Sequence, residues 1–274
     1  MTVRRLTRTE IRRLLDDHGL SPSRALGQNF LCEPTTIDKI VRLAGVSPGD
    51  RVLEIGPGLG SLTVALADAG ARVLAVEIDR YLIPALRSVV GDLDVEVLHA
   101  DAMELDWSAH LGDDDWSVVA NLPYNISTPL VLDLLAQQPQ LQRFLVMVQR
   151  EAGERLAASP GTKAYGIPSV LVAYWAEARI AGVVSAEVFL PRPKVESVLV
   201  EIVRHPTSPS EAGFDAIAEL VRAGFGQRRK MLRRALADRV DADQFAAAGV
   251  DPTLRAEQLT LTDWDRLAVS VAGA

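Results

Sequence analysis

The sequence predicts an α/β protein, with a doubly wound, Rossmann-like sheet followed by a small all-helical domain at the C-terminus. Two observations predict this architecture. Short apolar or β-branched runs alternate with segments of helical period over residues 52–148, whereas the chain after residue 210 shows helical segments and no convincing strand. Strands that alternate with helices form mostly parallel sheets, and a strand-free tail forms a separate helical unit.

The predicted parallel strands are short apolar runs, as expected of strands buried on both faces. They are Val52–Ile55, Arg72–Val76, Val95–His99, Trp116–Ala120 and Phe144–Val148. The helices expected between them are Ser61–Ala69, Tyr81–Val90 and Pro129–Gln137. The basic segment Met1–Leu15 carries charges at helical spacing and is expected to form an N-terminal helix.

The pattern changes after Gln149. A helix around Glu151–Ala157 leads into a loop with glycine and proline, and another helix follows. Glu177–Val183 and Val198–Val203 are predicted to add an antiparallel edge to the sheet. Residues 205–210 have linker composition, so we place the domain boundary there, between domains 1–205 and 206–274.

Composition excludes several classes of protein. With 48% hydrophobic and 24% charged residues, the chain has the make-up of a soluble globular protein. No apolar run is long enough to span a bilayer, and Met1–Leu15 lacks the apolar core of a signal peptide, so no membrane partner is expected. The single cysteine, Cys32, forms no internal disulfide and offers no zinc constellation. We expect no metal site and a cytoplasmic location.

A glycine-rich turn follows the first strand, in Gly56-Pro57-Gly58-Leu59-Gly60. Glycines there allow the backbone to approach a ligand closely. Glu77 ends the next strand, where a carboxylate suits ribose hydroxyls, and Asp101 follows the third strand, where it would accept from an adenine amino group. NAD is the competing ligand, but the turn lacks the G-x-G-x-x-G spacing, and Glu54 suits an ammonium group better than a diphosphate.

Asn121-Leu122-Pro123-Tyr124 follow a predicted strand directly, at the edge where open α/β sheets build their sites. An Asn carbonyl accepts a hydrogen bond from an exocyclic amino group, the proline stiffens the turn, and the tyrosine offers a stacking face. The pattern therefore suits a flat ring that bears an amino group, such as a nucleobase. An Asn-capped turn with a core tyrosine is the alternative that these four residues leave open.

Charge is unevenly distributed. The net charge is −7, which by itself argues against a nucleic-acid partner, yet two segments are strongly basic. One is the N-terminus, and the other contains Arg222, Arg228, Arg229, Lys230, Arg233 and Arg234. A solvated helix face explains either run, but a localised anionic partner is also compatible with them.

With these residues assembled, the chain resembles the class I S-adenosylmethionine-dependent methyltransferases, and more narrowly the ribosomal RNA adenine dimethyltransferases of the KsgA/RsmA type. Several independent motifs over most of the chain carry the resemblance. They are Gly27–Leu31 (GQNFL), Glu54–Gly60, the acids Glu77 and Asp101, Asn121–Thr128 (NLPYNIST), Val188–Ser197 (with FxPxPKVxS), Phe225–Leu236 and Leu254–Leu259.

The resemblance implies methylation of N6 on two adjacent adenosines near the 3′ end of small-subunit rRNA, with S-adenosylmethionine as donor and a pre-30S particle as substrate. Asn121 and the Leu122 carbonyl would accept from the amino group, and Tyr124 would stack on the base. Phe189 is a candidate for the opposite face of the base or for the core. The same resemblance implies two further roles. Asn29 and Leu31 would contact the methionine part of the donor, and the Arg222–Arg234 run would form a helix that binds phosphates.

Three alternatives remain at this point. An Erm-type enzyme acting on 23S rRNA shares the fold, but Leu122 and the FxPxPKVxS motif favour the small-subunit substrate. A DNA N6-adenine methyltransferase usually has proline in place of Leu122. A non-catalytic ribosome-assembly factor would keep the fold, although the intact Glu77 and Asn121 argue against lost catalysis. A monomer is the simplest oligomeric state.

Overall fold

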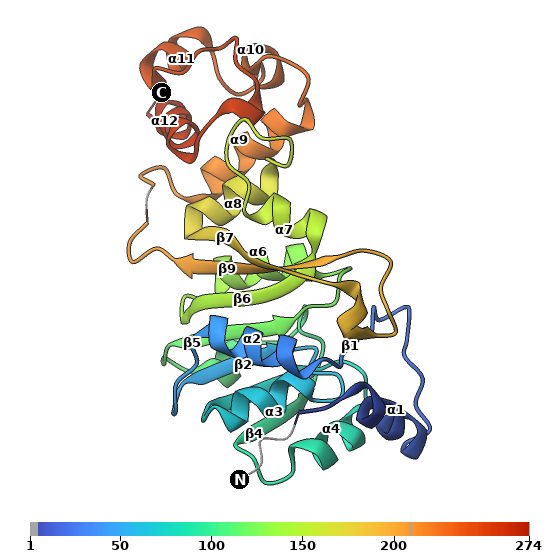
Figure 1. The fold of residues 1–274 in the computed structure, drawn as a ribbon. Helices are drawn as coiled ribbons and strands as arrows, with labels where there is room; N and C mark the ends of the chain where they lie inside the picture. Colours follow the sequence, from blue (N-terminus) through green and yellow to red (C-terminus); the bar gives the residue numbers. More distant parts are fainter. Residues whose placement is uncertain (1–4, 209, 274) are drawn as a thin grey trace. The chain divides into compact units, whose positions relative to one another are not determined.

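The computed structural model describes residues 5–208 and 210–273, which form two units. The first consists of residues 1–153 and 180–203, and the second of residues 154–179 and 204–274. Figure 1 shows the elements of both. No helix among the described residues is long and apolar enough to cross a membrane.

A seven-stranded mixed sheet carries the first unit, in the order β4-β3-β2-β5-β6-β9-β7. Five strands run parallel to one another and match the predicted ones: β2 (Arg51–Ile55), β3 (Arg72–Glu77), β4 (Val95–His99), β5 (Trp116–Asn121) and β6 (Leu141–Gln149). β9 (Ser197–Arg204) pairs antiparallel with β6, as predicted, and β7 (Ala176–Val184) is the edge strand beyond it. The predicted α/β fold is confirmed.

Helices cover the sheet between the strands. They are α1 (Arg8–Asp17), α2 (Pro34–Ala44), α3 (Ser61–Asp68), α4 (Ile83–Val90), α5 (Ser108–Leu111) and α6 (Ser127–Gln137). Local sequence explains their ends: Thr7 and Glu10 form a capping box at α1, and α2 begins with Pro34 and stops at left-handed Gly45. In Figure 1, α2 and α3 lie in front of the sheet and α6 lies behind it. Sequence reasoning did not anticipate α2.

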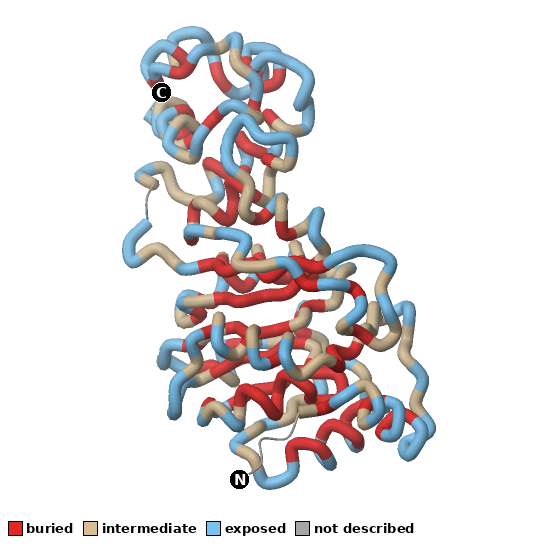
Figure 2. Tube along the Cα trace, viewed as in Figure 1, coloured by how far each residue is buried: buried red, intermediate tan, exposed pale blue. Residues whose placement is uncertain are grey.

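One face of the sheet and the helices α2 and α3 share a core. Ile37 and Ile40 of α2 pack with Leu66 of α3 and with strand residues such as Val119 and Leu145. In Figure 2 the inner strands β2, β3, β5, β6 and β9 are largely buried, whereas β4 and β7 at the two edges of the sheet are mostly intermediate or exposed. A second cluster joins α1 to α4, through Ile11 and Leu86 among others.

A second, two-stranded sheet also escaped prediction. β1 (Phe30–Leu31) pairs antiparallel with β8 (Phe189–Leu190), which follows the short 3-10 turn η1 (Ala186–Val188). Arg8 of α1 donates from its guanidinium to the carbonyl oxygens of Phe189 and Glu187. Arg8, one of the arginines of the basic N-terminal segment, therefore forms hydrogen bonds within the fold.

The second unit is helical and has its own core. Its elements are α7 (Arg150–Leu156, which begins in the first unit), α8 (Ile167–Trp175), α9 (Phe214–Gly226), α10 (Leu232–Ala235), α11 (Ala242–Ala248), η2 (Ala256–Gln258) and α12 (Leu261–Ala272). Trp264 is fully buried at its centre, and Tyr165 and Tyr174 from before the predicted boundary pack into the same core. The helical unit thus recruits residues 154–179, which we had placed in the first domain.

Hydrogen bonds attach the loop before α8 to the end of the chain. The Tyr165 hydroxyl donates to the Leu259 carbonyl at 2.8 Å, and the Gly161 N–H donates to the Glu257 carbonyl at 2.8 Å. A boundary drawn from linker composition at residues 205–210 misses this loop, because the loop joins the helical unit through contacts distant in sequence.

Candidate active site

The carboxyl ends of the parallel strands meet at one edge of the sheet. β2 and β3 pair Ile55 with Val76, β3 and β4 pair Glu77 with His99, and β5 ends at Asn121. An open cleft lies over this edge, and its volume is about 880 Å³ when the open solvent inside it is included. It is lined by all the predicted cofactor residues: Asn29, Leu31, Gly56, Gly58, Glu77, Asp101 and Asn121.

The glycine-rich turn brings bare backbone into the cleft. Gly56 and Gly58 have φ of +71° and +59°, a region that residues with a Cβ rarely adopt. A Cβ on Gly58 would lie 2.9 Å from Phe30 Cδ1, and one on Gly56 would lie 3.3 Å from Pro123 Cδ. The turn therefore packs between the N-terminal segment and the Asn121–Tyr124 turn, and only glycine fits at Gly58.

Glu77 is buried and held by two backbone donors. The Gly58 N–H donates to Oε2 at 3.0 Å and the Asp79 N–H donates to Oε1 at 2.9 Å. Burial raises the pKa of Glu77, while these two hydrogen bonds oppose the rise. The carboxylate is thus fixed in the cleft wall, with remaining lone pairs to accept from ligand hydroxyls.

Asp101 lies at the other side of the same wall. Its Oδ1 accepts from the Met103 N–H at 2.9 Å, which fixes the carboxylate at the start of the turn after β4. The carboxylate retains capacity to accept from a ligand amino group, because each carboxylate oxygen has two lone pairs.

Glu54 is a buried carboxyl in the cleft wall. Its side chain is 2% exposed, and Oε2 has no hydrogen-bond partner among the described residues. Burial raises the pKa of Glu54 to about 8, the neighbouring Thr63 hydroxyl lowers it, and the Glu77 carboxylate raises it further. A buried, unpartnered carboxyl in a cleft wall fits a ligand that brings a positive group, as the ammonium and sulfonium of S-adenosylmethionine would.

The side-chain amide of Asn121 has a defined orientation. Its Nδ2 donates to the Asn29 backbone carbonyl at 3.1 Å. Because the nitrogen is committed to that carbonyl, Oδ1 is the atom that remains to accept from a substrate amino group. The neighbouring Leu122 donates its N–H to the Met147 carbonyl at 3.1 Å, which ties the turn to β6.

The N-terminal segment connects this amide to the Glu77 side of the cleft. The Gln28 side chain accepts from the Ser23 N–H at 2.7 Å and donates to Asp79 Oδ2 at 2.7 Å. Asp79 in turn donates its N–H to Glu77. Sequence reasoning missed Gln28, although it stands inside the GQNFL motif beside Asn29.

Tyr124 lines the cleft with its hydroxyl anchored. The hydroxyl lies 2.7 Å from the Ser197 Oγ, at the start of β9. Burial raises the pKa of Tyr124 above its usual value, against the effect of the Ser197 hydrogen bond. Ser197 was also missed as a site residue, although it closes the FxPxPKVxS motif.

Phe189 corrects one expectation. Its side chain is 0% exposed and packs in the core with residues such as Ile37 and Leu199, and Phe189 is not part of the cleft lining. Of the two roles considered for it, the structure supports the core. The physical reason is the β1–β8 pairing, which places Leu31 opposite Phe189 and directs both into that core.

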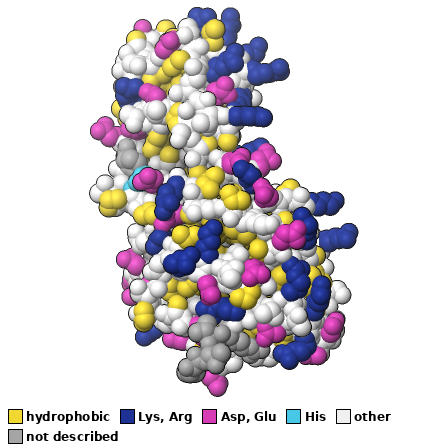
Figure 3. All heavy atoms as spheres, in the orientation of Figure 1, with side chains coloured by type: hydrophobic (Ala, Val, Ile, Leu, Met, Phe, Trp, Pro, Cys, Tyr) yellow, Lys and Arg dark blue, Asp and Glu magenta, His cyan; other side chains and the backbone are white. Residues whose placement is uncertain are grey.

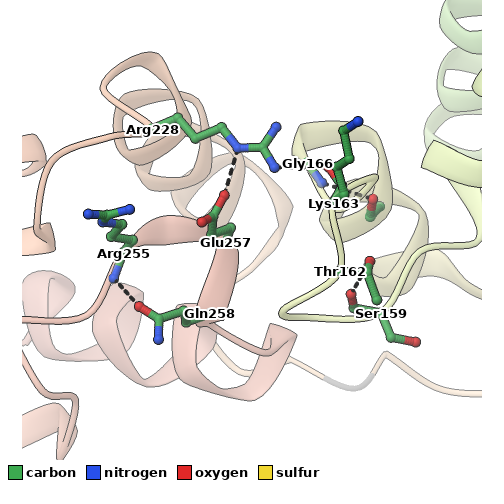
Figure 4. A network of polar contacts seen from close by, with 9 residues as sticks. Ser159, Thr162, Lys163, Gly166, Arg228, Arg255, Glu257 and Gln258 are labelled. Carbon is green, nitrogen blue, oxygen red and sulfur yellow. Dashed lines mark hydrogen bonds and ion pairs between the residues drawn. The ribbon is translucent and has the colours of Figure 1, made fainter.

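The predicted basic helix is also corrected, because the Arg222–Arg234 run is interrupted. α9 ends at Gly226, and α10 begins only at Leu232. Arg228 is a tether: it pairs with Glu257 at 2.7 Å and donates to the Lys163 carbonyl at 3.0 Å (Figure 4). Arg222, Arg229, Lys230, Arg233 and Arg234 are all exposed. In Figure 3, Lys and Arg side chains group along one edge of the helical unit.

No group of three His, Cys, Asp or Glu side chains suited to a metal ion occurs in the part of the chain that the structure describes. The cleft chemistry is that of backbone amides, two buried carboxyls, an oriented carboxamide and an aromatic face. This set is chemically suited to a nucleoside with a cationic side chain on one side, and it offers an acceptor and an aromatic ring on the other.

Comparison with known proteins gives a consistent picture. Residues 20–272 match the profile of the family described as "Ribosomal RNA adenine dimethylase". The chain is 47% identical to the ribosomal RNA small subunit methyltransferase A of Leifsonia xyli subsp. xyli, over 97% of this chain and 98% of the relative. The protein of that name from Mycobacterium avium is 45% identical, over 97% and 88%.

Two solved structures match most of the chain. A dimethyladenosine transferase from Plasmodium falciparum superposes with a TM-score of 0.74 at 26% identity, over 87% of this chain and 95% of the other. The 23S rRNA methyltransferase ErmE superposes with a TM-score of 0.71 at 25% identity, over 89% and 100%. The fold alone therefore does not separate a dimethyladenosine transferase from a 23S rRNA methyltransferase.

Proposed function

The chain belongs to the ribosomal RNA adenine dimethylase family, and we propose that it dimethylates N6 of two adjacent adenosines near the 3′ end of small-subunit rRNA, within the pre-30S particle. It is an S-adenosylmethionine-dependent rRNA adenine dimethyltransferase, and its substrate is small-subunit rRNA. The finer points, namely the two adenosines, the particle and the residue roles below, are our proposal.

The single observation that carries the residue roles is the hydrogen bond from Asn121 Nδ2 to the Asn29 carbonyl, 3.1 Å long. It leaves Oδ1 to accept a hydrogen bond from one N–H of the adenine amino group, and the Leu122 carbonyl accepts a hydrogen bond from the other N–H. Two in-plane acceptors favour a pyramidal nitrogen, whose lone pair then points out of the ring plane. Positioning of this kind contributes up to about 7–11 kcal/mol in favourable intramolecular models.

Tyr124 holds the face of the same adenine. Base–aromatic stacking is worth about 1–3 kcal/mol, enough to retain a base that has left its own stack. Asn121 and Tyr124 stand three residues apart in one turn, so edge and face of the base are held by one rigid piece of backbone, stiffened by Pro123.

The cofactor side is held by separate residues. Glu77 accepts from the ribose hydroxyls, Asp101 from the adenine amino group, and Glu54 meets the ammonium. Asn29 and Leu31 cover the methionine part from the N-terminal segment. When bound, the cofactor supplies an electrophilic methyl group. The chain needs no strong base, because the amino proton becomes acidic once nitrogen gains a fourth substituent and passes to water.

RNA is held by the helical unit. The exposed residues Arg222, Arg229, Lys230 and Arg234 supply charge for phosphates in a protein whose net charge is −7. Arg228 contributes less, because it is engaged with Glu257. We place the enzyme in the cytoplasm as a monomer that works on its particle.

The experiment is methyl transfer from labelled cofactor to immature 30S particles, 50S particles and duplex DNA in parallel. We expect label on the 30S particles alone, at adenine N6. Label on 50S rRNA would instead assign the chain to the Erm-type reaction. A protein that binds no S-adenosylmethionine would be a non-catalytic assembly factor.

A further inference from the structure

The ring of Tyr124 is fixed at its far end by one buried serine. The Tyr124 hydroxyl and the Ser197 Oγ lie 2.7 Å apart. Ser197 is 0% exposed, whereas Tyr124 is half-buried and lines the cleft. A cleft residue thus depends on a side chain that belongs to the sheet and does not line the cleft.

The position of Ser197 is set by strand pairing. Ser197 is the first residue of β9 and pairs with Gln149, the last residue of β6. The Arg150 N–H donates to the Glu196 carbonyl at 3.0 Å, which continues the pairing by one more bond. The serine hydroxyl is therefore a fixed point of the central sheet, reached by the tyrosine from the loop after β5.

The backbone end of Tyr124 is fixed as well. The Ile126 N–H donates to the Pro123 carbonyl at 3.2 Å, and the Ser127 hydroxyl donates to the Tyr124 carbonyl at 3.3 Å. Without a contact at its far end, the side chain could swing about its first torsion, which has three staggered wells. The hydroxyl oxygen lies on the long axis of the ring, so the hydrogen bond at the phenol adds a second anchor that fixes the direction of that axis and hence where the ring lies.

We propose that Ser197 is a positioning residue for methyl transfer: through the Tyr124 hydroxyl it fixes the long axis of the ring, and so the place at which the target adenine stacks, relative to the acceptor atom of Asn121. The inference rests on the proposed function, since it assumes that Tyr124 stacks on the adenine. Burial keeps Tyr124 protonated at neutral pH, so the anchor is present under working conditions.

The consequence for the reaction is a matter of angle. Asn121 fixes the edge of the base and Tyr124 fixes its face, and transfer needs the amino nitrogen within about 3–3.5 Å of the methyl group. A ring free to tilt still stacks on the base, so affinity for the RNA persists. The fraction of bound adenines in reactive geometry falls, and that loss appears in kcat.

The test is a double-mutant cycle on methyl transfer to immature 30S particles. Tyr124→Phe and Ser197→Ala each remove one end of the anchor, and each should lower kcat about tenfold, the effect of one lost hydrogen bond. KM for the particle and the dissociation constant of the cofactor should change little. The double variant should be no slower than the slower single variant, because both substitutions break the same bond.

Multiplicative losses in the double variant would overturn the proposal, as would full kcat in Tyr124→Phe. Ser169→Ala is the matched control: Ser169 is also buried, at 2% exposure, and its hydroxyl donates to the Arg155 carbonyl in the helical unit. The kcat of Ser169→Ala should equal that of the wild type. If Ser169→Ala instead lowers kcat as much as Ser197→Ala does, the effect at Ser197 is only that of losing a buried hydroxyl, and the proposal is wrong.

Folding is checked by thermal unfolding of each variant. If Ser197→Ala does not fold, Tyr124→Phe decides alone, because it removes only an oxygen from a half-exposed ring. A wild-type enzyme without activity on any particle would contradict the proposed function. Failure of the Ser197 proposal looks different: the wild type is active, and the two substitutions lower kcat independently.

Discussion

The side-chain nitrogen of Asn121 donates to the backbone carbonyl of Asn29, across 92 residues of sequence. This bond connects the two halves of the cleft, because Asn29 belongs to the segment that covers the glycine-rich turn and Asn121 to the turn that we propose faces the base. It also uses a backbone acceptor, so substitution of Asn29 itself does not remove it. The orientation of the Asn121 amide depends on where the N-terminal segment lies.

Gln28 is the residue that attaches this segment to the ribose side, through its 2.7 Å bond to Asp79 Oδ2. We predict that Gln28→Ala weakens cofactor binding by about tenfold, the effect of one charge-assisted hydrogen bond. Gln28→Glu should be weaker still, because it places a carboxylate against Asp79. Calorimetric titration with S-adenosylmethionine measures both, and equal affinities for the two variants would argue against the tether.

The buried Glu54 predicts a dependence of stability on pH in the cofactor-free protein. Its pKa is raised from 4.5 to about 8, so the folded protein binds a proton that the unfolded chain releases. The stability linked to this proton is fully present below about pH 4.5 and is lost as the pH rises through 8. The loss amounts to a few kcal/mol, since each pKa unit corresponds to about 1.4 kcal/mol.

Glu54→Gln should remove most of that slope, because glutamine keeps the shape and does not ionise. Urea unfolding of both proteins between pH 5 and pH 9 measures it. A residual slope is expected from Glu77, whose pKa burial also raises. Parallel curves for the wild type and the variant would show that Glu54 is not the group that titrates.

The exposed arginines predict an effect on substrate binding alone. Arg229→Glu combined with Arg234→Glu should raise KM for 30S particles and leave kcat nearly unchanged, because neither residue lines the cleft. The logarithm of the binding constant should also depend less steeply on the logarithm of salt concentration, by about one unit for each phosphate that the variant no longer neutralises.

Arg228→Ala offers the contrast within the same run. It should lower the free energy of unfolding by about 1 kcal/mol through loss of the Glu257 ion pair, with a smaller effect on KM. If the Arg229 and Arg234 double variant shows the same salt dependence as the wild type, the RNA-binding surface lies outside this run.

The sequence predicted the parallel sheet and the cleft residues well, because both depend on local pattern. Each strand is an apolar run bounded by turn residues, and most of the predicted cofactor residues stand at or near the end of such a run, as Glu77 does. Asn29 and Leu31 are the exceptions, because they precede the first parallel strand. Parallel pairing then brings those ends to one edge, whatever the details of packing. The helix–strand alternation of residues 52–148 therefore contains most of the site.

What could not be predicted depends on contacts between distant segments. The burial of Phe189 follows from its pairing with Leu31, which no local signal announces. The role of Ser197 as partner of Tyr124 requires the antiparallel register of β9 on β6. Composition likewise placed the boundary at a proline-containing linker, whereas the helical unit also recruits the loop that contains Tyr165.

The central claim is that the Asn121 carboxamide, oriented by the Asn29 carbonyl, acts on adenine N6. Quantification of N6,N6-dimethyladenosine in rRNA from 30S particles, treated with wild type or Asn121→Ala at saturating cofactor, tests it most directly. We predict dimethyladenosine in 16S rRNA with the wild type. With the variant, the rate of dimethylation should be lower by a factor of about 10²–10³, as for loss of one oriented polar group at a reacting centre. Near-normal dimethylation by Asn121→Ala would contradict the account.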